Sequence, residues 1–76
     1  MSGSDPLAVT LEYSRGRAVR ERVVLVPAGT TVRALLRAEG QAPEGCAVLV
    51  GETPLPLDTP IVRAMRLTIV PTFSGG

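Results

Sequence analysis

Only one segment of this 76-residue chain has the spacing of an amphipathic helix, and that segment is short. In residues 32–39 the apolar positions 32, 35 and 36 share one face, and Arg33 and Arg37 lie on the opposite face, which we expect to meet solvent. An isolated helix of fewer than about 12 residues is marginally stable in water. The other apolar segments are therefore expected to form a sheet on which this helix packs.

The ends of the predicted helix carry recognisable stop and start residues. Thr30 or Thr31 can cap the first turn, because a threonine hydroxyl accepts a hydrogen bond from an otherwise unpaired amide there. Gly40 can end the helix, since glycine adopts the left-handed conformation without a steric penalty. Pro27 precedes the helix and ends the strand before it, because proline has no amide hydrogen to donate to a ladder.

A hairpin is expected before the helix. Residues 7–13 alternate apolar and polar side chains, which predicts a half-buried strand with Leu7, Val9, Leu11 and Tyr13 on one face. The turn at 14–17 contains a glycine and leads into a second strand at about 19–26. Its second half is a run of four apolar residues, which leaves open which of them face inward.

Three further strands are expected after the helix. Residues 46–50 form an apolar strand, and 66–70 form the last one, with Leu67 and Ile69 inward and Thr68 and Val70 outward. Between them, residues 53–60 contain three prolines, so at most a short edge strand can form there. Pro71 is expected to end the last strand.

The element order predicts an α+β fold: a mixed four- to five-stranded sheet packed on one helix, in the order ββαβ(β)β. We expect one domain at 7–71, a flexible leader at 1–6 and a flexible tail at 72–76 that closes with Gly75 and Gly76. The apolar content of 45% and charged content of 20% are typical of a folded chain.

Composition excludes several classes of function. The sequence has no histidine and one cysteine, Cys46, so neither nucleophilic catalysis nor a cysteine-based metal site is expected; we expect Cys46 in the core. All basic residues are arginine, so within these residues no lysine can accept an isopeptide bond. The net charge of +1, with glutamates among the hairpin arginines, argues against nucleic acid. Without an apolar span or secretory signal, we expect a cytoplasmic protein that does not enter a membrane.

Several segments resemble the ubiquitin-like β-grasp family, most closely its prokaryotic branch of sulfur carriers and small archaeal modifier proteins. Residues 47–52 look like the family's apolar strand and tight turn, and residues 56–60 look like the segment that follows. Residues 67–76 look like the last strand and tail, including the Ser-Gly-Gly end, whereas eukaryotic ubiquitin has an arginine-rich end. In the first half, 26–32 resembles the approach to the helix.

The resemblance implies that the chain is an acyl or sulfur carrier rather than an enzyme, with no catalytic residue, metal or bound cofactor. An ATP-dependent activating enzyme would adenylate the carboxylate of Gly76. A sulfur donor would convert the adenylate into a thiocarboxylate for tRNA thiolation or cofactor synthesis, or the acyl group would pass to a target lysine. Thr72, Phe73, Ser74 and Gly75 would thread into the activating enzyme.

The resemblance also implies a docking surface for partners. Leu49 and Val70 are expected on the outward faces of neighbouring strands as a small apolar patch, and Arg63 and Arg66 could contact acidic groups of the activating enzyme. Phe73 is expected to dock on the activating enzyme or on a downstream synthase. Many relatives have Gly-Asp where this chain has residues 63–66, so the turn before the last strand is expected to differ.

Two alternatives stay open. The chain could be the small subunit of molybdopterin synthase, whose tail inserts into a large subunit. It could also be a non-covalent β-grasp binding module whose final glycines are incidental. In each case we expect a monomer when the protein is free.

Overall fold

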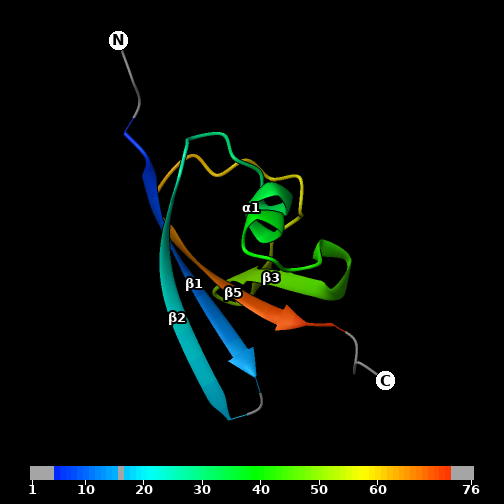
Figure 1. The fold of residues 1–76 in the computed structure, drawn as a ribbon. Helices are drawn as coiled ribbons and strands as arrows, with labels where there is room; N and C mark the ends of the chain where they lie inside the picture. Colours follow the sequence, from blue (N-terminus) through cyan, green and yellow to red (C-terminus); the bar gives the residue numbers. More distant parts are fainter. Residues whose placement is uncertain (1–4, 16, 73–76) are drawn as a thin grey trace.

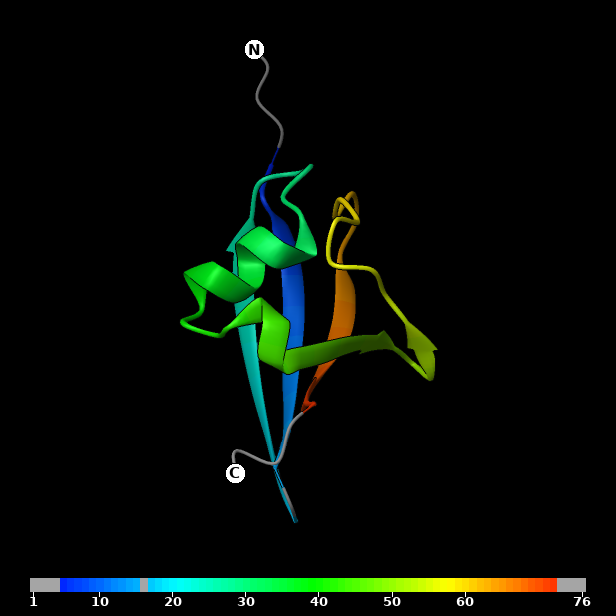
Figure 2. The ribbon, with the colours of Figure 1, turned by 90° about the vertical axis from the view of Figure 1, so that its right-hand side faces the viewer.

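The computed structural model describes residues 5–15 and 17–72, which form a mixed sheet with one helix on one side of it (Figures 1 and 2). The elements follow in the order β1 (Leu7–Arg15), β2 (Ala18–Val26), α1 (Val32–Ala38), the 3-10 turn η1 (Pro43–Gly45), β3 (Cys46–Val50), β4 (Thr53–Pro54) and β5 (Met65–Pro71). The sheet has five strands in the spatial order β2-β1-β5-β3-β4. The predicted α+β class and element order are confirmed.

The hairpin of β1 and β2 fixes which side chains face the helix. The strands are antiparallel with Val9 opposite Val24, and opposite residues share a face. The expected inward face of β1 is confirmed, since Val9 and Leu11 are fully buried. The register also settles the apolar run of β2: Val24 and Val26 face inward, whereas Val23 and Leu25 face outward.

Helix α1 begins and ends close to the predicted positions. Thr31 is the N-cap, and its hydroxyl accepts a hydrogen bond from the Ala34 amide at 3.1 Å. Glu39 is the C-cap, and Gly40 follows in the left-handed region with φ of 78°. Arg37 is exposed as expected, and Arg33 is partly buried: its side chain lies 3.2 Å from the carboxylate of Asp58, which belongs to the loop after β4.

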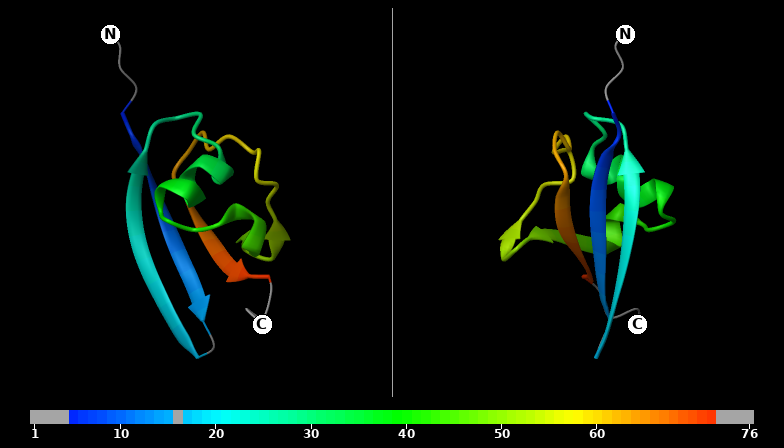
Figure 3. Two further views of the ribbon diagram at one scale, coloured as in Figure 1. Left: turned by 45° about the vertical axis from the view of Figure 1, so that its right-hand side comes forward. Right: turned by 90° about the vertical axis from the view of Figure 1, so that its left-hand side faces the viewer.

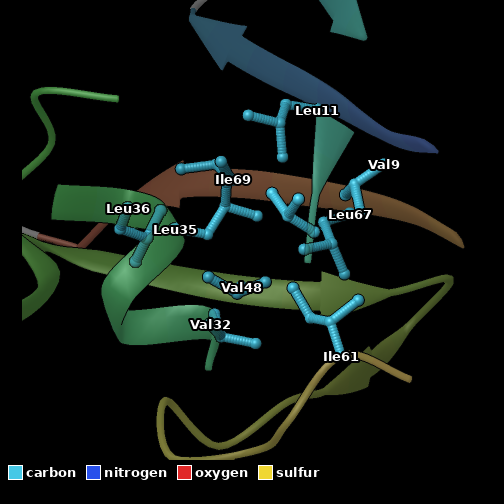
Figure 4. Close-up of a cluster of buried hydrophobic side chains, with 10 residues drawn as sticks. Val9, Leu11, Val32, Leu35, Leu36, Val48, Ile61, Leu67 and Ile69 are labelled. Atoms are coloured by element: carbon cyan, nitrogen blue, oxygen red, sulfur yellow. The ribbon is translucent and has the colours of Figure 1, made fainter. Parts of the chain in front are cut away.

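The core lies between α1 and the inward face of the sheet (Figure 4). It consists of Val9, Leu11, Val26, Val32, Leu35, Leu36, Val48, Ile61, Leu67 and Ile69. Ile61 belongs to none of the strands, yet it is only 1% exposed. Its amide donates to the Thr30 carbonyl at 2.8 Å, and its carbonyl accepts from the Gly29 amide at 2.8 Å. These bonds attach the loop before β5 to the start of the helix.

Strand β5 lies in the middle of the sheet, parallel to β1 and antiparallel to β3. It is one residue longer at each end than predicted, and Pro71 belongs to it, opposite Cys46. Proline is tolerated here because it is the terminal residue of the strand. The turn η1, which the sequence analysis did not predict, comes directly before β3.

Candidate functional site

The candidate site begins where β5 leaves the sheet. The amide of Thr72 donates a hydrogen bond to the carbonyl of Gly45 at 2.9 Å, so η1 supplies the acceptor that holds the residue after the strand. Thr72 is exposed. The predicted attachment residue Gly76 and the predicted threading residues Phe73, Ser74 and Gly75 lie outside the described residues. The described structure therefore gives a defined position to Thr72, the first residue of the candidate tail.

A group of polar side chains lies around Tyr13 on β1, and Cys46, which pairs with Pro71, is part of it. The side chain of Glu39, at the end of α1, lies 2.9 Å from the Arg22 guanidinium on β2. Burial, and then the negative charge of Glu39, raise the pKa of the Tyr13 phenol. Cys46 packs against the core as a partly buried residue, and burial raises the pKa of its thiol. A neutral thiol is a weak nucleophile, so Cys46 is better suited to packing than to reaction.

The predicted apolar patch lies on the sheet face opposite the helix. Leu49 pairs with Thr68 and Ala47 pairs with Val70 in the antiparallel ladder of β3 and β5. Leu49 and Val70 are therefore diagonal neighbours on the outward face, and both are partly buried. The structure brings these two residues together; their role in docking stays a prediction.

The two predicted arginines, Arg63 and Arg66, differ in their contacts. Arg66 on β5 donates to the Glu21 carboxylate at 2.5 Å and lies 3.6 Å from the Glu12 carboxylate, so it is held toward β1 and β2. The hydrogen bond to Glu21 raises the pKa of Arg66. Thr68 donates to Glu12 at 3.2 Å and extends this polar network. Arg63 is exposed in the loop before β5.

A second apolar row on the same face was not predicted. Val19, Val23 and Leu25 on β2 are 58%, 63% and 66% exposed. Residues 23–26 show no alternation, so it is the register of the hairpin that puts Val19, Val23 and Leu25 on the outward face. The polar network of Glu12, Glu21, Arg66 and Thr68 begins within this row at Glu21, crosses β1 and ends on β5, the strand that carries Val70.

The comparison with protein families settles the relationship. Residues 12–76 match the ThiS family. The chain belongs to the ThiS family. Members of this family are small sulfur carriers with a ubiquitin-like fold, and activating and sulfur-transfer proteins act on them. The match includes the C-terminal residues 73–76 that carry the predicted attachment site.

A solved structure shows the same fold. The protein named Caldiarchaeum subterraneum ubiquitin superimposes with a TM-score of 0.69 at 11% sequence identity, over 93% of this chain and 99% of that chain. The ThiS chain therefore has the ubiquitin-like β-grasp fold that its sequence predicted. No curated protein sequence matches it.

The described part of this ThiS chain offers little else for chemistry. Residues 5–15 and 17–72 hold no cluster of three or more histidine, cysteine, aspartate or glutamate side chains that could bind a metal ion. Within the same residues, α1 is the single α-helix, and it is far too short to cross a membrane.

Proposed function

We propose that this protein is a sulfur carrier whose Gly76 carboxylate is adenylated and then converted to a thiocarboxylate. The observation that supports the proposal most directly is the ThiS match, because it runs to residue 76 and so includes Gly75 and Gly76. A terminal glycine pair has no side chains to obstruct a narrow active-site channel. The reacting group is thus the chain's own carboxyl end.

The proposed chemistry follows from the weak reactivity of a carboxylate. A carboxylate oxygen of Gly76 attacks the α-phosphorus of ATP on the activating enzyme, and pyrophosphate leaves. In the resulting mixed anhydride, AMP is a good leaving group. A hydrosulfide anion supplied by the donor attacks the acyl carbon and displaces AMP, and loss of the remaining proton from sulfur gives the thiocarboxylate. ATP is bound by the partner, and this chain contributes the acyl group alone.

The described geometry is consistent with a tail on a rigid base. Thr72 is tied to Gly45, and β5 is held on both sides, so the first residue of the tail has a defined position. The four residues beyond it can span at most about 14 Å when extended. We therefore propose a folded unit at 7–71 and a working tail at 72–76, with Thr72, Phe73, Ser74 and Gly75 threading into the activating enzyme.

Docking of the activating enzyme is proposed on the outward face near the tail. Leu49 and Val70 form the small apolar contact there. Arg63 is available for an acidic group of the enzyme because it is exposed. Arg66 can take part if the enzyme's carboxylate replaces or joins Glu21. Phe73 is proposed to bind the activating enzyme or the downstream synthase.

The same activated acyl group can serve other acceptors. Transfer to a lysine amine of a target protein would make the chain a protein modifier, and insertion of the tail into a large subunit would make it the small subunit of molybdopterin synthase. Acceptor choice is proposed to reside in the partner proteins, because the described part of this chain holds no candidate catalytic group for the transfer.

Intact mass spectrometry tests the proposal. Protein isolated from its native cells is expected to contain a fraction heavier by the difference between sulfur and oxygen, located on Gly76. Deletion of Gly76 is expected to abolish this species and ATP–pyrophosphate exchange by the activating enzyme, whereas deletion of Ser2, a one-residue change at the other end, leaves both intact. Lysines of other proteins carrying Gly-Gly remnants would support the modifier role.

The competing idea of a non-covalent binding module makes a different prediction. In that case the chain lacking Gly76 would keep its partner, and neither sulfur on Gly76 nor Gly-Gly remnants would be found under conditions that demand sulfur transfer. That result would refute the carrier proposal.

A further inference from the structure

The two edges of the sheet differ in how they are protected. Strand β4 has two residues, Thr53 and Pro54, and Pro56 follows soon after, so this edge offers little backbone for pairing. Strand β2 forms the other edge, with nine residues and no proline, and among residues 5–15 and 17–72 it pairs with β1 alone (Figure 3). A long open edge presents a row of unpaired amide and carbonyl groups, which is a template for another strand.

On the open face, β2 presents an apolar row. Val19, Val23 and Leu25 are 58%, 63% and 66% exposed. Glu21 lies among them, and its carboxylate accepts a hydrogen bond from Arg66 at 2.5 Å. Arg66 also lies 3.6 Å from Glu12, so these three side chains together carry one negative charge. An added strand would therefore place its side chains against apolar surface on this face and bury part of it.

On the helix side, the same strand is basic. Arg20 and Arg22 are exposed there. Arg22 shares its charge with Glu39 at 2.9 Å, and in the described part of the chain Arg20 has no ion pair. Val24, the next inward residue, is partly buried against the core. A strand beside β2 would thus meet Arg20 and the Arg22–Glu39 pair on one face and mostly hydrocarbon on the other.

These charges disfavour a second copy of the chain as the occupant. In a two-fold antiparallel pairing that keeps the sheet faces aligned, centring on Arg22 sets that residue opposite its own copy. Centring on Glu21 sets Arg20 opposite Arg22 and Glu21 opposite its own copy. Like charges directly opposite each other are destabilising. If the two-fold axis lies closer to Val26, fewer residues are paired, and Arg22 comes to lie opposite a valine.

We propose that the β2 edge binds an extended segment of another protein by strand addition, and that this segment alternates apolar and acidic residues. The apolar side chains would pack on Val19, Val23 and Leu25, and the acidic ones would pair with Arg20 and Arg22. A segment of about 5–6 residues, the usual strand length, would suffice. This surface is separate from the tail and from Leu49 and Val70, so a partner held here leaves the acyl end free for activation.

The experiment uses the full-length, ¹⁵N-labelled chain and defined peptides. The probe is an acetylated and amidated eight-residue peptide of alternating valine and glutamate, and the matched control replaces each glutamate with lysine. The glutamate peptide is expected to shift amide resonances of residues 18–26. The lysine peptide is expected to bind at least tenfold more weakly. Two further peptides are N-methylated, one at its valines and the other at its glutamates. One of the two is expected to lose binding, because the amides that would donate hydrogen bonds to β2 are blocked in it.

Variants of exposed residues keep the test independent of folding. Arg20→Glu is expected to reverse the preference in favour of the lysine peptide. Val23→Lys is expected to weaken binding at least tenfold while thiocarboxylate formation on Gly76 stays unchanged, and Val62→Lys, at a valine that is 68% exposed outside the strands, is expected to change neither. If the protein with the parent sequence carries no thiocarboxylate, the sulfur-carrier function is refuted and the proposal of strand addition at β2 still stands.

Three results would overturn the proposal: equal binding of both peptides, shifts confined to β3 and β5, or no shift at millimolar peptide. A fourth would be a concentration-dependent shift of residues 18–26 without peptide, with a dimer in sedimentation. That result would assign the edge to a second copy of the chain.

Discussion

Replacement of Ile61 by alanine should destabilise this domain more than its place in a loop suggests. Ile61 is 1% exposed within the core, and its backbone bonds at 2.8 Å to Gly29 and Thr30 keep the loop in place. The neighbouring loop therefore cannot easily collapse into the space that the missing side chain leaves. Val62, the next residue, is 68% exposed and provides a matched control.

The expected magnitude follows from the burial. Truncating a fully buried isoleucine to alanine costs about 2–5 kcal/mol, and we take about 3 kcal/mol for this site. A domain of this length has a total stability of about 4–11 kcal/mol at 0.05–0.15 kcal/mol per residue, so the variant should keep about 1–8 kcal/mol of it. Ile61→Val should cost about 1 kcal/mol. Val62→Ala should stay within about 0.5 kcal/mol of the parent.

Urea unfolding followed by circular dichroism measures these differences. With a slope of about 1 kcal/mol per molar urea for so small a domain, Ile61→Ala should lower the midpoint by about 3 M, and Ile61→Val by about 1 M. If Ile61→Ala costs less than about 1 kcal/mol, or if Val62→Ala costs as much, the assignment of Ile61 to the core is wrong.

Two further predictions concern the helix and the thiol. Thr31→Ala should lower the free energy of unfolding by about 1 kcal/mol because the Ala34 amide loses its acceptor, and Thr31→Ser should retain most of it; urea titration of the three proteins checks this, and an unaffected alanine variant would contradict the cap. Burial raises the pKa of the Cys46 thiol, so its alkylation by iodoacetamide should be slower in the folded chain than in urea. The rate in the folded chain should rise at a higher pH than the rate in urea. Identical pH profiles in both states would contradict this prediction.

Much of the fold could be predicted because its signals are local. Alternation identified the inward face of β1, and the cap residues Thr31 and Gly40 identified both ends of the helix. The run at the end of β2 could not be assigned, because four successive apolar residues carry no period of two. Its faces depend on the register of the hairpin. Ile61 was missed for a similar reason: its burial results from contacts with a loop distant in the sequence.

The candidate site divides in the same way. The glycine pair at positions 75 and 76 and the apolar residues Leu49 and Val70 were accessible from the sequence through strand alternation and family resemblance. The contact of Arg66 with Glu21 joins residues 45 positions apart, and no local pattern indicates it. The open edge of β2 likewise depends on the strand order, which becomes evident only when the sheet is assembled.

The central position of β5 also determines how this domain responds to force. A pull on the C-terminal tail acts on a strand flanked by a parallel ladder to β1 and an antiparallel ladder to β3. The load lies along the strand, so the hydrogen bonds of both ladders are sheared together rather than opened one at a time. A partner that binds the tail can therefore draw the folded domain toward itself without detaching a strand from the sheet. The same geometry makes the tail end a poor starting point for an ATP-driven unfoldase.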